Sequence, residues 1–290
     1  MIITNKYDLP QVIVDFAKDD GYSAGKSNIS VTTLLNSPRI VQLQKKHWNQ
    51  IESDVAKRFF MILGTAVHYM MEKNAPKNVI SEERIHTHFN GWDISGGIDS
   101  QQVEEDGVIL SDYKITSAWA AMNEKPDWEQ QLNLYAWLVE REKKLPVKKL
   151  QIIAVIRDWK QRDVGKEGYP PAPMVVIDIK MWTGEEREAF MSERLNEHAE
   201  ADTSAMLGSD ISKCTPAEQW RTQDTFAVMK NKTGVRALRV LDTREEADKF
   251  AAETSNEAVV VARPGYARRC HEYCDVSKFC QQFKDENEIL

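Results

Sequence analysis

Long apolar runs are missing from this 290-residue sequence, and no cysteine occurs in its first two hundred residues. A transmembrane helix needs roughly 20 consecutive apolar residues, so the first absence argues against a membrane protein. The opening residues, MIITNKYDLPQVIVDF, carry acids early and lack a small-residue cleavage site, which argues against a signal peptide. A secreted disulfide framework would have denser, more even cysteines. We therefore expect a cytoplasmic protein with no membrane partner.

A net positive charge is also missing, because the formal net charge is −7. Phosphate neutralisation drives non-specific nucleic-acid binding, so the chain cannot act as a general polycation. An acidic metal site inside a groove would lower the net charge without excluding DNA. The hydrophobic share of 42% and the charged share of 29% are typical of a globular protein.

Alternating apolar residues and turn signals predict an antiparallel meander between residues 80 and 114. Asn90-Gly91 and residues 105–107 are the turns that separate its strands. Helical periodicity and composition predict helices over 29–47 (interrupted at Ser37-Pro38), 51–74, 127–144 and 184–207, and two further buried strands over 149–158 and 173–182.

The amino-acid pattern of the chain changes after Leu207, which suggests a domain boundary. We expect a first domain over residues 1–207, with a helical N-terminal part. Residues 208–263 read as an inserted module whose elements run β-β-α-β. Residues 264–290 form a cysteine-rich tail that we expect to pack back on the first domain.

Candidate site residues gather around the stretch DYK. Asp112 and Lys114 share one face of a strand because side chains alternate along it. A hairpin can bring Asp99, in GGIDS, beside Asp112. Two neighbouring carboxylates repel unless a cation lies between them, and hard oxygen ligands suit Mg²⁺ or Mn²⁺. Lys114 would then offset charge that develops on a phosphate.

Two helices contribute further candidates. His68 lies four residues after Gly64, and we expect that glycine to let its helix pack tightly against the sheet, with the imidazole as a metal ligand. Gln131 and Tyr135 are four apart and share a helix face, from which both can reach a phosphate or a water network.

The order G-x-x-x-H, G-x-x-D, D-x-K, Q-x-x-x-Y resembles the RecB-type branch of the PD-(D/E)XK nucleases. It is formed here by Gly64 to His68, Gly96 to Asp99, Asp112 to Lys114 and Gln131 to Tyr135, and the resemblance covers about residues 29–182. The proline that names the superfamily is replaced by Ile98, as is common in this branch.

The resemblance implies an α/β fold, a mixed sheet flanked by helices, with a small α+β insertion and a cysteine-ligated C-terminal segment. It implies that Asp99, Asp112, the Tyr113 backbone carbonyl and His68 hold the metal. Lys114 would orient the attacking water, while Gln131 and Tyr135 would orient Lys114 or a phosphate. The activity implied is metal-dependent hydrolysis of DNA, at ends or on single strands, in recombination, repair or phage DNA processing.

The tail spacing C-x3-C-x5-C, at Cys270, Cys274 and Cys280, resembles iron–sulfur nucleases of the AddB and CRISPR-adaptation types. Their fourth ligand typically precedes the core, where this chain has Ser37. Cys214 can complete a set of four thiolates, which a [4Fe–4S] cluster needs. Zinc, bound by four thiolates or by three with His271, is the alternative.

Two other functions remain open at this stage. One is a non-catalytic DNA-binding subunit that an iron–sulfur or zinc site stabilises. The other is a metal-binding interaction protein with residues 219–263 as its working surface. Because the sequence contains no helicase motor segment, it resembles a stand-alone, phage-type exonuclease. A recombination partner protein and a homo-oligomer are both left open.

Overall fold

The computed structural model describes residues 1–290 except 19–24, 124 and 289–290. The chain divides into two compact units, Met1–Ile211 and Ser212–Leu290. Among the described residues, no helix is both long and apolar enough to cross a membrane.

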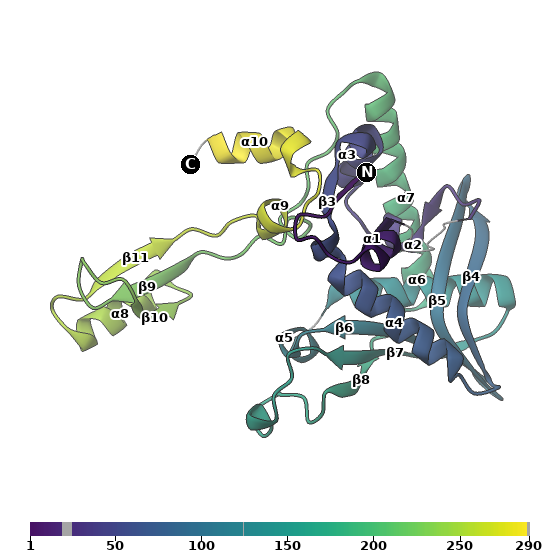
Figure 1. The fold of residues 1–290 in the computed structure, drawn as a ribbon, viewed down its shortest axis with the longest axis horizontal. Coiled ribbons are helices and arrows are strands. Elements are labelled where there is room, and N and C mark those ends of the chain that lie inside the picture. The colour runs from purple at the N-terminus through teal and green to yellow at the C-terminus, as the bar shows by residue number, and fades with distance from the viewer. Residues whose placement is uncertain (19–24, 124, 289–290) are drawn as a thin grey trace. The chain divides into compact units, whose positions relative to one another are not determined.

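A six-stranded mixed sheet organises the first unit (Figure 1). Its strands are β2 (Ile29–Ser30), β4 (Val79–Phe89), β5 (Trp92–Glu104), β6 (Gly107–Thr116), β7 (Val147–Ile156) and β8 (Met174–Ile179). The order is β2-β5-β6-β7-β8, with β4 also paired to β5. The predicted meander is thus β4-β5-β6, whose neighbours run antiparallel, while β6 and β7 run parallel.

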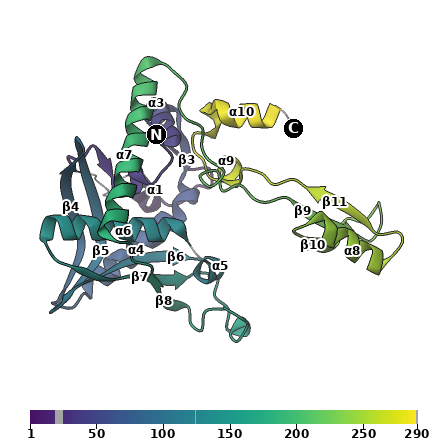
Figure 2. The same cartoon turned by 180° about the vertical axis from the view of Figure 1, so that it is seen from behind.

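Helices cover both faces of this sheet. The helices of the first unit are α1 (Gln11–Lys18), α2 (Val31–Leu34), α3 (Pro38–His47), α4 (Phe59–Lys73), α5 (Ala118–Met122), α6 (Pro126–Lys143) and α7 (Gly184–Leu207). Helix α6 lies on one face, and α4 crosses the other (Figure 1 and, from behind, Figure 2). This is the mixed α/β architecture that the sequence predicted.

The core of the first unit lies between the sheet and α6, and α6 is nearly continuously buried from Leu132 to Val139. Gly96 of β5 permits this close approach, because a Cβ there would lie 2.6 Å from Leu138 Cδ1 and 3.1 Å from the Tyr135 ring. Gly64 of α4 differs from Gly96, because a Cβ at Gly64 would have no described atom within 4 Å. The expectation that Gly64 allows tight packing was therefore wrong.

The predicted helix over 51–74 begins later than expected. Residues 52–54 form β3 (Glu52–Asp54), which pairs in parallel with β1 (Ile2–Thr4), and η2 (Val55–Arg58) follows as a 3-10 turn. Asp54 ends the strand, because its carboxylate accepts hydrogen bonds from Ala56 N and from the Lys6 N–H. Two further 3-10 turns are η1 (Trp48–Gln50) and η3 (Gln161–Asp163).

The second unit contains a small antiparallel sheet with the order β10-β9-β11. Its elements are β9 (Thr225–Met229), β10 (Ala237–Leu241), α8 (Arg244–Thr254), β11 (Val259–Arg263), α9 (Arg268–Glu272), η4 (Ser277–Phe279) and α10 (Gln281–Glu288). Val228, Ala247 and Ala251 form the buried centre between the sheet and α8. The packing of the tail on the first domain stays a prediction, and residues 289–290 of that tail lie outside the described residues.

Candidate active site

The β5–β6 hairpin places Asp99 opposite Asp112. The strand pairing runs from Glu104 and Gly107 to Ser100 and Ser111, and it stops there. One residue further along β5, the Asp99 side chain replaces the backbone pairing, because its Oδ2 accepts a hydrogen bond from the Tyr113 N–H at 2.8 Å. The two strands therefore separate where the two carboxylates meet, and the side chain of Asp99 bridges the opening.

Asp112 and Lys114 form an ion pair on one face of β6, as alternation predicted. Lys114 Nζ lies 2.6 Å from Asp112 Oδ2, and the Asp112 side chain is only 2% exposed. Among the described residues no hydrogen bond reaches the buried Asp112 Oδ2, so the Lys114 ammonium is the group that balances its charge.

Gln131 of α6 fixes both members of this pair. Its Nε2 donates to Asp112 Oδ1 at 3.2 Å, and its Oε1 accepts from Lys114 Nζ at 3.1 Å. The same Nε2 lies 2.8 Å from Tyr135 Oη, which accepts from it one turn along the helix. Tyr135 is buried, and its hydroxyl contacts the Gln131 amide that also contacts Lys114.

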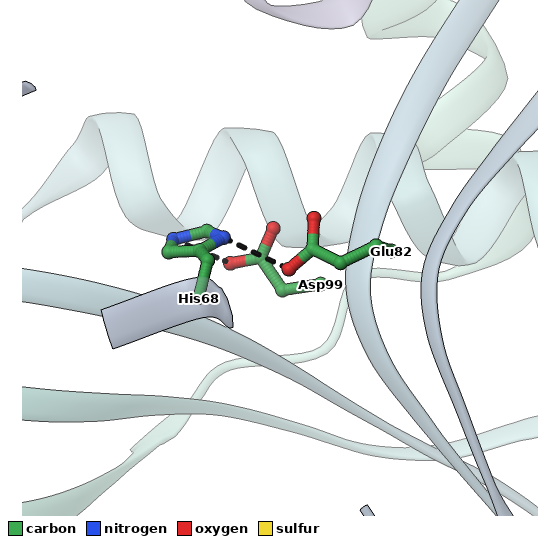
Figure 3. Close-up of side chains that lie close together, drawn as sticks. All are labelled: His68, Glu82 and Asp99. Atoms are coloured by element: carbon green, nitrogen blue, oxygen red, sulfur yellow. Dashed lines mark hydrogen bonds and ion pairs between the residues drawn. The ribbon is translucent and has the colours of Figure 1, made fainter. Parts of the chain in front are cut away.

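His68 of α4 joins Asp99 and Glu82 in a compact trio (Figure 3). Its Nδ1 lies 2.9 Å from Glu82 Oε1, and its Nε2 lies 3.6 Å from Asp99 Oδ2. One ligand atom from each residue lies within 4.8 Å of the others, which is metal-ligand spacing. Asp112 does not belong to this group, because Lys114 and Gln131 hold its carboxylate.

Glu82 was missed by the sequence reasoning, although the turn at Asn90-Gly91 carries the signal. Both turn residues have positive φ, 49° and 79°, as a two-residue hairpin turn requires. Counting seven residues back from Phe89 and seven on from Trp92 sets Glu82 opposite Asp99. Glu82 itself has a φ of 52°, an unusual conformation for a strand residue that is typical of functional sites.

The electrostatics of the trio follow from burial and crowding. Burial, with the Asp112 charge, raises the pKa of Asp99 from 3.8 to about 7. The hydrogen bond to Glu82 raises the pKa of His68, and burial opposes that rise. Both groups therefore retain protons in the folded protein at pH values where the unfolded chain has lost them.

We expect Asp99→Asn to stabilise the metal-free protein at pH 8. The folded state retains a proton on Asp99 between pH about 4 and 7, so stability from this group falls as pH rises through that window. The shift corresponds to about 4 kcal/mol, and Asn can still accept from the Tyr113 N–H. In EDTA, the melting temperature should rise by about 5 °C or more at pH 8 and little near pH 4.

Asp93→Asn is the matched control, because Asp93 lies on the same strand with a side chain that is 59% exposed. An equal rise for both variants, or no rise for Asp99→Asn, would show that burial of this carboxylate carries no such cost.

The predicted metal ligands have the donor types of a hard-cation site, and the structure groups two of them, Asp99 and His68, with Glu82. Asp99 and Asp112 contribute carboxylates at the strand opening, and the Tyr113 carbonyl lies on the peptide segment between Asp112 and Lys114. The Tyr113 ring packs edge-on against His68, with centroids 5.5 Å apart, which fixes the imidazole. Oxygen donors with one imidazole suit Mg²⁺ or Mn²⁺.

The four cysteines lie in the second unit, and no disulfide joins them. Burial, followed by the neighbouring thiols of Cys274, Cys214 and Cys280, raises the pKa of Cys270 to about 12. Gln282 of α10 ties the segment of Cys214 to the tail: Cys214 N donates to Gln282 Oε1 at 2.8 Å, and Gln282 Nε2 donates to the Cys214 carbonyl at 3.0 Å. The fold thus gathers cysteines that are far apart in sequence.

Comparisons with known proteins place this site in context. Residues 32–281 match the PD-(D/E)XK nuclease superfamily. A search of curated proteins found no match. Among solved structures, SSO0001 is similar with 14% identity, a TM-score of 0.45, and coverage of 69% of this chain and 86% of that one. A candidate exonuclease from Eubacterium rectale is similar with 9% identity, a TM-score of 0.32, and coverage of 69% and 81%. The match over residues 32–281 shows that the chain belongs to the PD-(D/E)XK nuclease superfamily.

Proposed function

We propose that this protein is a Mg²⁺- or Mn²⁺-dependent deoxyribonuclease that acts as an exonuclease at DNA ends or on single strands. The observation that carries the proposal is the Asp112–Lys114–Gln131 arrangement beside Asp99. It combines a buried carboxylate, the Lys114 ammonium 2.6 Å from its Oδ2, and an amide that holds both groups.

Different residues would bind the metal ion and donate hydrogen bonds during phosphodiester hydrolysis. Asp99, Asp112, the Tyr113 carbonyl and His68 would hold the divalent ion, and Glu82 orients His68 by its hydrogen bond at Nδ1. When bound, such an ion neutralises phosphate charge and lowers the pKa of a coordinated water.

Lys114, held by Gln131, donates to the attacking water or to a phosphate oxygen. The water oxygen bonds to phosphorus and loses one proton to solvent, the bond between phosphorus and the leaving sugar oxygen breaks, and that oxygen gains one proton from solvent.

We also propose a [4Fe–4S] cluster on Cys214, Cys270, Cys274 and Cys280. Four thiolates are what such a cluster needs, and the thiols of Cys274, Cys214 and Cys280 all act on Cys270 in the folded chain. The spacing C-x3-C-x5-C is irregular, whereas zinc ribbons favour C-x2-C pairs. Zinc is therefore the less favoured occupant.

End-labelled DNA tests the nuclease proposal directly. We expect the purified protein to release short products from single-stranded DNA and duplex ends with Mn²⁺ or Mg²⁺, and to release none in EDTA, because the paired carboxylates need a cation. Gel analysis over time gives the product ladder. Binding to DNA without cleavage under every metal condition would contradict the enzyme and favour the non-catalytic DNA-binding subunit.

A further inference from the structure

Helix α4 leaves apolar side chains facing solvent beside the candidate site. Its sequence, FFMILGTAVHYMMEK, is largely apolar, yet none of its 15 residues is buried. Phe59 and Phe60 at its first turn are 55% and 52% exposed, and their rings contact edge to face at 5.3 Å. Helices of soluble proteins normally bury their apolar stripe, so an exposed one marks a surface for a binding partner.

A cation lies over one of these two rings. The Arg157 guanidinium lies 4.7 Å from the centroid of the Phe60 ring. Arg157 is fixed by its backbone, because its N–H donates to the Thr116 carbonyl at 2.9 Å. Thr116 is the last residue of β6, two positions after Lys114. The Phe60–Arg157 pair therefore lies at the end of the strand that carries the candidate catalytic lysine.

A second ring–cation pair lies at the same end of the sheet. Trp119 on α5 is 61% exposed, and Lys125 Nζ lies 4.5 Å from its ring centroid. Helix α5 directly follows β6 and lies beside the ends of β6 and β7 in Figure 1. Asp158, just after β7, fixes it there by accepting a hydrogen bond from the Ala118 N–H at 2.7 Å.

The segment after β7 gives this end of the sheet a positive charge. Residues 157–166, RDWKQRDVGK, contain four cations and two acids. Both acids have partners in the first unit: Asp158 accepts a hydrogen bond from the Ala118 N–H, and Asp163 forms an ion pair with Lys166 at 2.6 Å. Exposed rings among cations match a single strand of nucleic acid, in which bases stack and phosphates pair.

We propose that Phe60 and Trp119 stack on bases of an unpaired DNA strand and lead its backbone to Lys114, while Arg157 and Lys125 contact its phosphates. This inference rests on the proposed nuclease function. A duplex hides the faces of its bases, so only an unpaired strand or a frayed end can use these rings. The two aromatic residues would then select single-stranded over double-stranded DNA.

Binding of fluorescent oligonucleotides in EDTA, where cleavage is blocked, tests the inference by anisotropy. Alanine at one stacking ring costs about 1–3 kcal/mol, so Phe60→Ala and Trp119→Ala should each raise the Kd for a single-stranded oligothymidine at least about fivefold. The Kd for a blunt duplex should barely change. Phe60→Tyr should restore most of the affinity, because a ring remains. Trp48→Ala is the control, since Trp48 is an aromatic residue of similar exposure, 51%, that lies on η1 and not on α4 or α5.

Two results would overturn the stacking role. One is an equal loss of affinity for duplex and single strand, or no loss. The other is a change of molecular mass for Phe60→Ala in light scattering, which would assign the apolar face to a second copy of the chain.

Hydrolysis of thymidine 5′-(p-nitrophenyl phosphate) with Mn²⁺ separates the two proposals, because this ester contains a single nucleotide and offers no strand for the rings to position. If wild type does not cleave it, the nuclease function fails. If wild type and both alanine variants cleave it equally, a loss confined to single-stranded binding assigns the rings to strand positioning.

Discussion

Lys114→Met is expected to lower the rate of DNA cleavage by about 10³-fold. Methionine keeps the length of the side chain and removes its charge and donors. The loss of one preorganised donor aimed at developing charge typically costs about 10²–10³ in rate, and Gln131 would lose the group that it positions. Single-turnover rates with saturating Mn²⁺ measure the effect on the chemical step.

The variant also leaves the buried Asp112 carboxylate without its ion pair, so the folded state must be checked by its melting temperature. Lys149→Met is the matched control, because Lys149 lies on the neighbouring strand β7 in a more exposed pair with Asp178. Cleavage within about tenfold of wild type by a folded Lys114→Met protein would remove Lys114 from the reaction.

Cys274→Ser is expected to abolish the proposed cluster and to destabilise the second unit. The buried apolar centre of that unit is small, and α9 contains no buried residue. Ligand bonds to four thiolates would therefore contribute much of the order in the tail. Iron and sulfide should fall from about four each per chain to near zero, and proteolysis within residues 264–290 should accelerate.

Ser277→Ala, in the same tail, is the control and should keep its iron and colour. A colourless wild-type protein with one zinc ion per chain would overturn the cluster and favour the zinc alternative. Because the raised pKa values of Cys270 and Cys274 keep these thiols protonated near neutrality, uptake of either metal should release protons and should strengthen as pH rises.

The sequence predicted which residues of the candidate site lie beside each other in pairs, but not how all of them are arranged together. Alternation put Asp112 and Lys114 on one face, and the hairpin put Asp99 opposite Asp112. The sequence suggested that His68 joins Asp99, but it did not reveal that Glu82 joins them, because that contact depends on how α4 packs over the sheet. Nor did it reveal that Gln131 contacts Asp112 and Lys114 at once.

The sequence by itself determined the long helices and central strands of the first unit, the meander, and the motifs at 99, 112 and 114, because periodicity and turn residues act over a few neighbours. It did not predict β1 or α5, and it placed residues 29–30, which form β2, in a helix. It misplaced the start of α4, because hydrogen bonds of Asp54 favour a turn before the helix. It also misjudged the role of Gly64, which lies at an open surface. Only the tertiary structure joined Glu82 to His68 and brought Gln131 to both Asp112 and Lys114. Contacts between such distant residues depend on strand register and on how helices pack, which no local pattern encodes.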